Sequence, residues 1–165
     1  MTKILITEFI DSQSLQNINK KFDVIYKKDV WQNKDFLERE IQKFDGIIVR
    51  NKTSLDKKIL INASNLKFIG RLGVGLDNID TEYCKKNNII VQPATGMNSD
   101  SVAEYVVNSS LTLLKKTHII KEQTLQGKWP RTSIVTKELK GKTLGLIGFG
   151  DISKKVLNLS LQVSL

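Results

Sequence analysis

Length, composition and charge limit what this chain of 165 residues can be. With 40% hydrophobic and 26% charged residues it has the balance of a globular protein rather than a disordered one, and no apolar run approaches the ~20 residues that cross a bilayer. The net charge of +9 comes mostly from lysine pairs scattered without aromatic residues between them, which argues against a nucleic-acid surface and favours a solvated one.

The first part of the chain alternates between short apolar runs and longer amphipathic segments. The apolar runs predict strands at residues 4–7, 22–26, 46–50, 67–72 and 89–92. The segments between them predict helices at residues 12–20, 33–44, 56–63 and 81–87. This alternation indicates βαβ units, so we expect an α/β fold with a small, doubly wound parallel sheet. No signal-peptide pattern precedes the first strand, and we therefore expect a cytoplasmic protein.

The pattern changes after the fifth predicted strand. Proline and glycine at residues 93–96 indicate a boundary. Ser101 and Glu104 then form a Ser-x-x-Glu capping box ahead of a periodic apolar stretch. This combination predicts one long helix from Ser101 to about Gln126, with Gly127 as its stop.

A variant of the dinucleotide-binding fingerprint, GFGDIS at residues 148–153, follows a predicted strand at 143–147 and precedes a predicted helix. Gly148 would make the tight turn, Gly150 would let the backbone approach a pyrophosphate, and Ser153 takes the place that needs a small residue. Glycine pairs also end ordinary strands, so the motif depends on its strand–turn–helix context. The acidic residue that reads the ribose would fall about 20 residues further on, beyond this sequence, which leaves NAD and NADP open.

A second glycine-containing turn ends the predicted strand at 67–72. Arg71 offers a fork of donors for a carboxylate or phosphate, and Gly73 and Gly75 let backbone amides face a ligand. Arg50 has the matching place on the previous strand, and open α/β sheets bind ligands at the carboxyl ends of their strands. The alternative is a turn in which Arg71 makes a structural ion pair. The spacing alone favours neither interpretation over the other.

Three isolated residues have both a functional and a structural interpretation. Asn98, just before the predicted long helix, offers an amide to the same ligand or simply begins the helix. Cys84 is the only cysteine, which excludes an intramolecular disulfide, and we interpret it as core packing. Its pairing with the only histidine, His118, as a nucleophile is the less favoured alternative. No group of residues predicts a metal site.

Five motifs follow one another in order: RLGVGLDNID at 71–80, PATGMN at 93–98, VAEYV at 102–106, GKWPR at 127–131 and GKTLGLIGFG at 141–150. Together they resemble the D-isomer-specific 2-hydroxyacid dehydrogenases, in the branch of the phosphoglycerate and sulfolactate dehydrogenases. The resemblance implies a flavodoxin-like substrate domain at residues 1–98. It also implies that residues 99–165 begin a Rossmann nucleotide-binding domain.

The resemblance implies roles on the substrate side. Arg50 and Arg71 match positions that hold the anionic groups of the substrate. Gly73 and Gly75 lie in the loop whose amides meet the substrate carboxylate, and Asn98 matches a substrate-side residue. The substrate implied is a small anionic 2-hydroxy acid.

On the cofactor side the resemblance implies bound NAD, with NADP not excluded. Val74 would lie beside the nicotinamide, and Asp151 and Ile152 match the pair at the pyrophosphate. Many relatives have arginine in place of Asp151, and a carboxylate there should repel a phosphate unless it turns away or caps the helix.

The family's reaction is hydride transfer between C4 of nicotinamide and C2 of a 2-hydroxy or 2-oxo acid. A late arginine, glutamate and histidine of the family's chain hold the substrate and exchange its proton. No residue here matches any of the three, so we predict no catalytic residue in this chain and an inactive 165-residue polypeptide.

Two functional hypotheses follow. The first is an oxidoreductase of the 3-phosphoglycerate, hydroxypyruvate or sulfolactate type, whose full-length relatives are homodimers that need no nucleic acid or membrane. The second is a non-catalytic module that senses a nucleotide or binds a protein on the same scaffold. The presence of both Arg50 and Arg71 favours the first.

Overall fold

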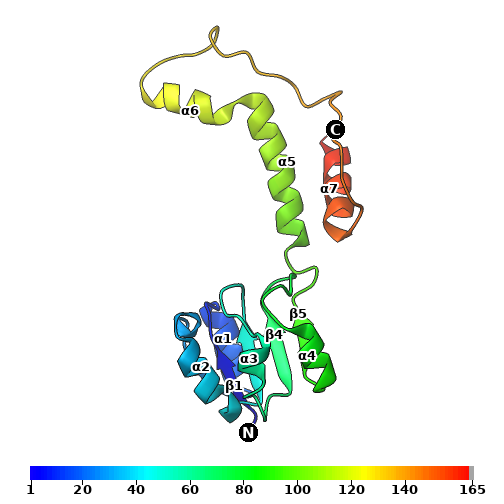
Figure 1. Cartoon of the computed structure of the whole chain (residues 1–165). Helices are drawn as coiled ribbons and strands as arrows, with labels where there is room; N and C mark the ends of the chain where they lie inside the picture. The colour runs from blue at the N-terminus through cyan, green and yellow to red at the C-terminus, as the bar shows by residue number, and fades with distance from the viewer. Residues whose placement is uncertain (164–165) are drawn as a thin grey trace. The chain divides into compact units, whose positions relative to one another are not determined.

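The computed structural model describes residues 1–163, and the chain forms two compact units that divide between Thr95 and Gly96 (Figure 1). The first unit contains every strand of the described residues, and the second consists of helices and extended segments. No helix within residues 1–163 is both long and apolar enough to span a membrane.

Five short parallel strands form the sheet of the first unit. They are β1 (Lys3–Ile6), β2 (Asp23–Tyr26), β3 (Gly46–Val49), β4 (Phe68–Arg71) and β5 (Ile90–Pro93). Their order in the sheet is β2-β1-β3-β4-β5, which is flavodoxin-like and confirms the predicted α/β class and parallel sheet. In this order the connections change direction at β1, so the topological switch point lies between β1 and β3.

The helices of the first unit connect the strands as predicted. They are α1 (Ser12–Asn19), α2 (Lys34–Glu40), α3 (Lys57–Leu60) and α4 (Thr81–Lys86), with short 3-10 turns η1 (Val30–Gln32) and η2 (Ile41–Lys43). A side-chain oxygen caps the start of each of these four α-helices by accepting a hydrogen bond from the backbone amide of the third residue of the helix. The capping residues are Asp11, Asn33, Asp56 and Asp80.

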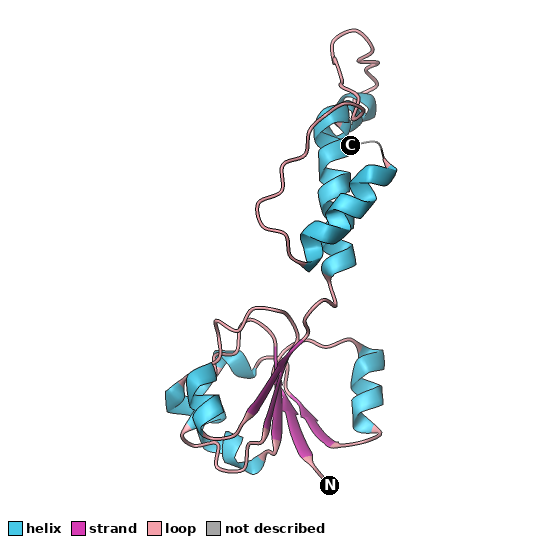
Figure 2. Cartoon of the chain, turned by 90° about the vertical axis from the view of Figure 1, so that its right-hand side faces the viewer, coloured by secondary structure: helices cyan, strands magenta, loops and turns pink. Residues whose placement is uncertain are grey.

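The two faces of the sheet are covered unequally, and Figure 2 shows a single helix on one side and the others opposite. Under α2, α3 and α4 lies the main core, in which the side chains of Leu5, Ile47 and Ile69 are 0% exposed. On the other face, α1 packs against β1 and β2, and Ile48 stays half-buried. Ile90, on the edge strand β5, is 64% exposed.

Three helices make up most of the second unit. They are α5 (Ser99–Lys115), α6 (Thr117–Leu125) and α7 (Asp151–Gln162). Helices α5 and α7 lie side by side (Figure 1), with Ala103 and Val156 buried and the ammonium of Lys155 donating to Asp100 at 2.8 Å. Gly127 follows α6 with φ +72°, which confirms it as the predicted stop.

The prediction of one unbroken helix to Gln126 was wrong. Lys116 adopts a left-handed conformation with φ +51° and separates α5 from α6. The carbonyl of Leu114, in the last turn of α5, accepts instead from the amide of Lys137 at 2.9 Å. A distant segment therefore satisfies a carbonyl that a continuing helix would have used.

The predicted capping box at Ser101 was also wrong. Helix α5 begins at Ser99, and the amide of Val102 already donates to the carbonyl of Asn98 at 3.0 Å. Ser101 therefore lies inside the first turn, where it cannot act as the cap. Glu104 then has no N-cap residue to pair with in a capping box.

Residues 143–147, predicted as a strand, have no strand structure. Ile147, which the prediction placed in a sheet, is fully exposed. A strand needs a neighbour for its amides and carbonyls, and within the described residues the second unit contains no other strand. The apolar run alone does not provide that pairing.

Candidate functional site

Arg50 and Arg71 end two neighbouring strands at the same edge of the sheet. Strands β3 and β4 pair in parallel with Val49 opposite Arg71, and the amide of Leu72 donates to the carbonyl of Val49 at 2.8 Å. Arg50 is exposed, whereas Arg71 is half-buried. The backbone thus brings both arginines to adjacent loops at the carboxyl-terminal edge, where sheets of this kind bind ligands.

Glu8, which the sequence analysis missed, anchors the loop that carries Arg50. Glu8 is 4% exposed, and its two carboxylate oxygens accept the amides of Arg50 (2.8 Å), Thr53 (2.9 Å), Lys52 (3.0 Å) and Asn51 (3.2 Å). Burial alone raises the pKa of this carboxyl, but the hydrogen bonds from Thr53, Arg50 and Lys52 outweigh it and hold the pKa below its ordinary value. Glu8 is therefore ionised at neutral pH.

A signal for this role exists in the sequence. Glu8 is the only charged residue in the apolar run ILITEFI at 4–10, and a buried carboxylate needs hydrogen-bond donors. Its partners could not be named in advance, because they lie 42–45 residues away along the chain.

Two further contacts hold the same loop. The amide side chain of Asn78 donates to the carbonyls of Thr53 at 2.7 Å and Arg50 at 3.3 Å. The buried hydroxyls of Thr7 and Thr53 hydrogen-bond at 2.8 Å. The end of β1 and the loops after β1 and β4 therefore fix the loop that carries Arg50.

The loop after β4 is built around Arg71 and Gly73. The amide of Gly73 donates to the carbonyl of Arg71 at 2.8 Å, and that carbonyl also accepts the amide of Ala94 at 3.0 Å. The guanidinium folds back so closely that a Cβ at Gly73 would overlap its Nη1 atom. The Nε atom of Arg71 is buried and has no hydrogen-bond partner among the described residues. Within residues 1–163 Arg71 also forms no ion pair, so the structural alternative finds no support.

The remaining residues predicted on the substrate side differ in whether their groups are free to bind a ligand. Gly73 uses its amide within the turn, whereas the described residues offer no acceptor to the amides of Val74 and Gly75. Val74 is 47% exposed. Asn98 belongs to the second unit, where it precedes α5 as the N-cap residue without a side-chain capping bond.

The fingerprint at residues 148–153 forms the turn and the helix but not the strand. Gly148 has φ +86°, a conformation that favours glycine. Gly150 is the N-cap residue of α7, and added Cβ atoms at Gly148 and Gly150 would meet no described atom within 4 Å. Ile152 and Ser153 lie in the first turn of α7, whose amides suit an anion such as a pyrophosphate. The residues present therefore fit one half of a dinucleotide site.

Asp151 is the first residue of α7, where its charge favours the helix dipole but opposes a phosphate. A carboxylate oxygen of Asp151 lies 3.7 Å from the position of a Cβ on Gly96. The pKa of Lys155 is raised, mainly by the hydrogen bond that its ammonium donates to Asp100. Burial acts in the opposite direction, and the charges of Asp100 and then Asp151 add smaller effects that raise it. The carboxylate of Asp151 is thus directed toward the start of α5 within the same unit.

Cys84 and His118 do not form a catalytic pair. Cys84 is 1% exposed in the main core, and burial together with the charge of Asp80 raises the pKa of its thiol to about 11. His118 is exposed on α6, in the other unit. The interpretation of Cys84 as core packing is confirmed. Within residues 1–163 no cluster of three or more metal-binding side chains occurs.

Comparison with known proteins gives a family match over most of the chain. Residues 4–145 match the family model described as "D-isomer specific 2-hydroxyacid dehydrogenase, catalytic domain". The chain is 36% identical to the (S)-sulfolactate dehydrogenase of Chromohalobacter salexigens over 167 residues, covering 99% of this chain and 54% of that protein. It is 33% identical to the hydroxypyruvate reductase of Thermotoga maritima, covering 96% of this chain and 52% of that protein. The chain therefore spans about half the length of these relatives.

Solved structures agree with this match. The D-lactate dehydrogenase from Aquifex aeolicus, complexed with NAD and lactic acid, has a TM-score of 0.84 at 29% identity, covering 98% of this chain and 49% of that one. The TT0316 protein from Thermus thermophilus has a TM-score of 0.89 at 22% identity, covering 99% and 54%, and supports the fold alone.

Proposed function

Because the chain belongs to the D-isomer specific 2-hydroxyacid dehydrogenase family, we propose that it supplies the substrate-binding part of an NAD(P)-dependent oxidoreductase. The substrate would be a small anionic 2-hydroxy or 2-oxo acid, of the kinds that its sulfolactate, hydroxypyruvate and phosphoglycerate relatives are named for. Residues 1–98 would form the substrate domain, and residues 99–165 would begin the nucleotide-binding domain.

The observation that supports this proposal is the guanidinium of Arg71, which is unpaired in the described part of the chain. Its buried Nε has no partner within the described residues, and an unsatisfied buried donor costs about 1–3 kcal/mol. A carboxylate of the substrate would accept from Nε and from the neighbouring guanidinium nitrogen in one bidentate contact. The open amides of Val74 and Gly75 lie in the same loop and would donate to the same group. Asn98 stays a predicted substrate-side residue, whose side chain makes no capping bond to α5.

The cofactor would be held by the turn and first helical residues of the second unit. Gly148 and Gly150 would admit the pyrophosphate, and the amides of Ile152 and Ser153 would face it. The nicotinamide of a bound cofactor would supply the hydride acceptor or donor, and Val74 stays the residue that the resemblance predicts for that part of the cofactor. Asp151 would tolerate the phosphate because its carboxylate lies toward Gly96.

Removing the guanidinium of Arg71 is expected to weaken substrate binding. Arg71→Ala should reduce the affinity of the 165-residue protein for sulfopyruvate by about 10- to 150-fold, the equivalent of about 1.5–3 kcal/mol for a charged hydrogen bond. Titration by calorimetry or by ligand-observed NMR measures this change. An unchanged dissociation constant would remove Arg71 from the site.

Gly73→Ala provides a matched variant, because its Cβ would displace the guanidinium while leaving the arginine in the sequence. It should lose most of the affinity that Arg71→Ala loses. Gly46→Ala is the control, since its Cβ would meet its nearest neighbour, Ile4, at an ordinary 3.5 Å. If Gly73→Ala bound sulfopyruvate as tightly as the unaltered chain, the folded-back arginine would not be the binding conformation.

We further propose that residues outside these 165 supply the proton-transfer groups. The only histidine, His118, is exposed on α6, and the resemblance does not match it to the family's catalytic histidine. The purified 165-residue polypeptide should therefore show no oxidation of NADH or NADPH with hydroxypyruvate, 3-phosphohydroxypyruvate or sulfopyruvate. Turnover above the protein-free rate, abolished by Arg71→Ala, would overturn this assignment.

A further inference from the structure

The two outer strands of the sheet, β2 and β5, differ in whether a further strand can pair with them. The amides of Ile90 and Ala94 donate toward β4. Because successive residues of a strand alternate in direction, Pro93 directs its backbone outward. Proline has no amide hydrogen to offer a neighbouring strand, and it is typical of edges that stay unpaired. The β5 edge is therefore closed to a further strand.

The outer edge of β2 keeps both kinds of backbone group. The amides of Asp23 and Lys27 donate toward β1, at 3.0 Å and 2.9 Å. Val24 and Tyr26 alternate with them and therefore direct their amides and carbonyls away from the sheet. β2 pairs with β1 alone, and among residues 1–163 no backbone group outside the sheet bonds to Val24 or Tyr26. Such a row of unpaired groups is a template for another strand.

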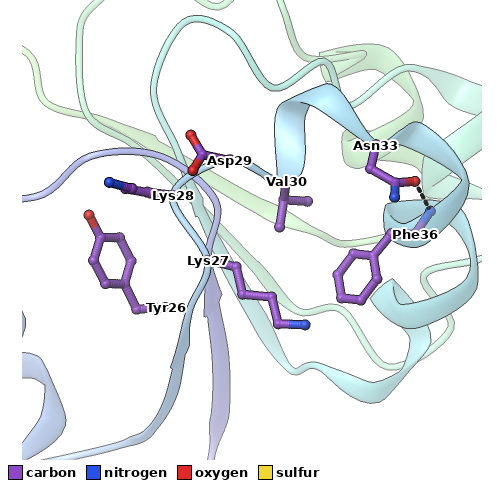
Figure 3. A pocket seen from close by; sticks show the side chains of 7 residues that line it. All are labelled: Tyr26, Lys27, Lys28, Asp29, Val30, Asn33 and Phe36. Atoms are coloured by element: carbon purple, nitrogen blue, oxygen red, sulfur yellow. Dashed lines mark hydrogen bonds between the residues drawn. The ribbon is translucent and has the colours of Figure 1, made fainter.

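The side chains of β2 divide between the two faces of the sheet. Ile25 packs against the main core, whereas Val24 and Tyr26 pack on the face that α1 covers. Asp23 and Lys27 are exposed and share the face of Ile25, because alternate residues of a strand lie on the same side. Figure 3 shows Tyr26 and Lys27 directed to opposite sides of the end of the strand. One face of this edge therefore carries an acid and a base four positions apart.

Lys27 lies beside an open hollow of about 410 Å³ at the carboxyl end of β2. Its ammonium is 4.2 Å from the centre of the Phe36 ring, which lines the same hollow (Figure 3). This contact orients the charge without neutralising it. In the described part of the chain neither Lys27 nor Asp23 forms an ion pair. The hollow therefore has room beside Lys27 for a carboxylate from another chain.

We infer that β2 pairs with β2 of a second copy of this chain, antiparallel and with Ile25 opposite Ile25. In this register the outward groups of Val24 meet those of Tyr26 of the second copy, and the two residues exchange both backbone hydrogen bonds. Asp23 of each copy then lies opposite Lys27 of the other. These are non-hydrogen-bonded positions, where facing side chains come closest and opposite charges stabilise the pair.

The charges along β2 favour this register over its neighbours. A shift of one residue would set outward groups against inward ones and lose the backbone pairing. A shift of two residues that sets Val24 opposite itself would bring Lys21 opposite Lys27. The same shift in the other direction would bring Asp23 opposite Asp29, and like charges that face each other destabilise a pair. In the proposed register Lys21 instead faces Asp29.

This interface is independent of the proposed function, because β2 carries none of the residues assigned to substrate or cofactor. It adds a continuous sheet of two copies to what the first unit can form. The partner is identified by its complementarity, since the same strand supplies the acid and the base that the pairing needs.

The test is a charge exchange on the 165-residue protein, followed by analytical ultracentrifugation from about 10 µM to 1 mM, a range suited to a weak dimer. The unaltered chain should show a monomer–dimer equilibrium. Asp23→Lys and Lys27→Asp each set like charges opposite each other, and each should raise the dissociation constant of the dimer by about tenfold or more. An equimolar mixture of the two variants should recover the dimer, because every substituted position then faces the opposite charge. Recovery on mixing excludes loss of structure as the cause.

Glu82→Lys is the matched control, because it makes the same change of charge on the exposed surface of α4. If it weakened the dimer as much as Asp23→Lys, general repulsion would explain the result and the inference would fail. A chain that stays monomeric over the whole range would show that the lysines protect the edge from pairing, which also overturns it. Association that Asp23→Lys leaves unchanged, or that mixing does not recover, would place the contact elsewhere.

Disulfide formation tests the register directly. Opposite residues at a non-hydrogen-bonded position have Cα atoms about 4.5 Å apart, within reach of a disulfide. Asp23→Cys mixed with Lys27→Cys should therefore cross-link faster than either variant alone. Cys84 is 1% exposed and adds no background. Faster cross-linking of either variant with itself would contradict the register.

Discussion

Replacing Glu8 by glutamine is expected to lower the free energy of unfolding of the first unit by about 2–4 kcal/mol. Glutamine has the size of glutamate, but its Nε2 group is a donor and would face amides that now donate to Glu8. At least one pair of these partly or fully buried amides would then lose its acceptor, at about 1–3 kcal/mol for each fully buried unsatisfied group and less for a partly buried one.

Fluorescence gives a local measurement of this effect. The chain has two tryptophans, Trp31 in the first unit and Trp129 in the second. In a Trp129→Phe background, urea unfolding followed by Trp31 emission reports on the first unit alone. Glu82→Gln, on the exposed surface of α4, is the control and should change stability by no more than about 0.5 kcal/mol. Equal stability of both variants would contradict the anchoring role of Glu8.

The same carboxylate makes the stability of the first unit depend on pH. The hydrogen bonds of Glu8 hold its folded-state pKa below the ordinary value of 4.5. Its contribution is therefore fully present above about pH 4.5 and is lost as the pH falls from there through the lower folded-state pKa. Over that range the stability of the unaltered chain should fall toward that of Glu8→Gln. A constant difference between the two down to pH 3 would contradict this linkage.

The sheet of the first unit could be predicted because its signals are local. Each strand is a short apolar run, and each connecting helix begins after a residue with an oxygen-bearing side chain, such as Asp11 or Asp80. The spacing of strands then placed Arg50 and Arg71 at adjacent strand ends. These predictions need no knowledge of which distant residues meet.

The features that could not be predicted depend on distant contacts. Glu8 finds its partners only when β1 and β3 pair, and the amide of Lys137 reaches Leu114 only in the folded second unit. The apolar run at residues 143–147 has strand-like composition but no neighbouring strand in the described part of its unit. The composition of a segment indicates a tendency to form a strand, but a strand forms only where a neighbouring strand pairs with it.

Ile47→Ala should be the most damaging single truncation in the sheet, lowering the free energy of unfolding by about 3–4 kcal/mol. Ile47 is 0% exposed on β3, and it belongs to the main core that α2, α3 and α4 cover. The truncation removes buried apolar surface and leaves a cavity between a central strand and three helices, where little can move to fill it. The urea transition of Trp31 should shift to clearly lower concentration.

Ile48→Ala removes the same atoms from the opposite face of the same strand. Ile48 is half-buried, because α1 is the only described helix of the first unit on its side and packs over β1 and β2. Its truncation should therefore cost less than half as much as that of Ile47, since much of the lost surface already contacts water and no closed cavity forms. Equal losses for the two variants would mean that something covers the α1 face of β3 in solution, and the two faces would then have to be regarded as equally buried.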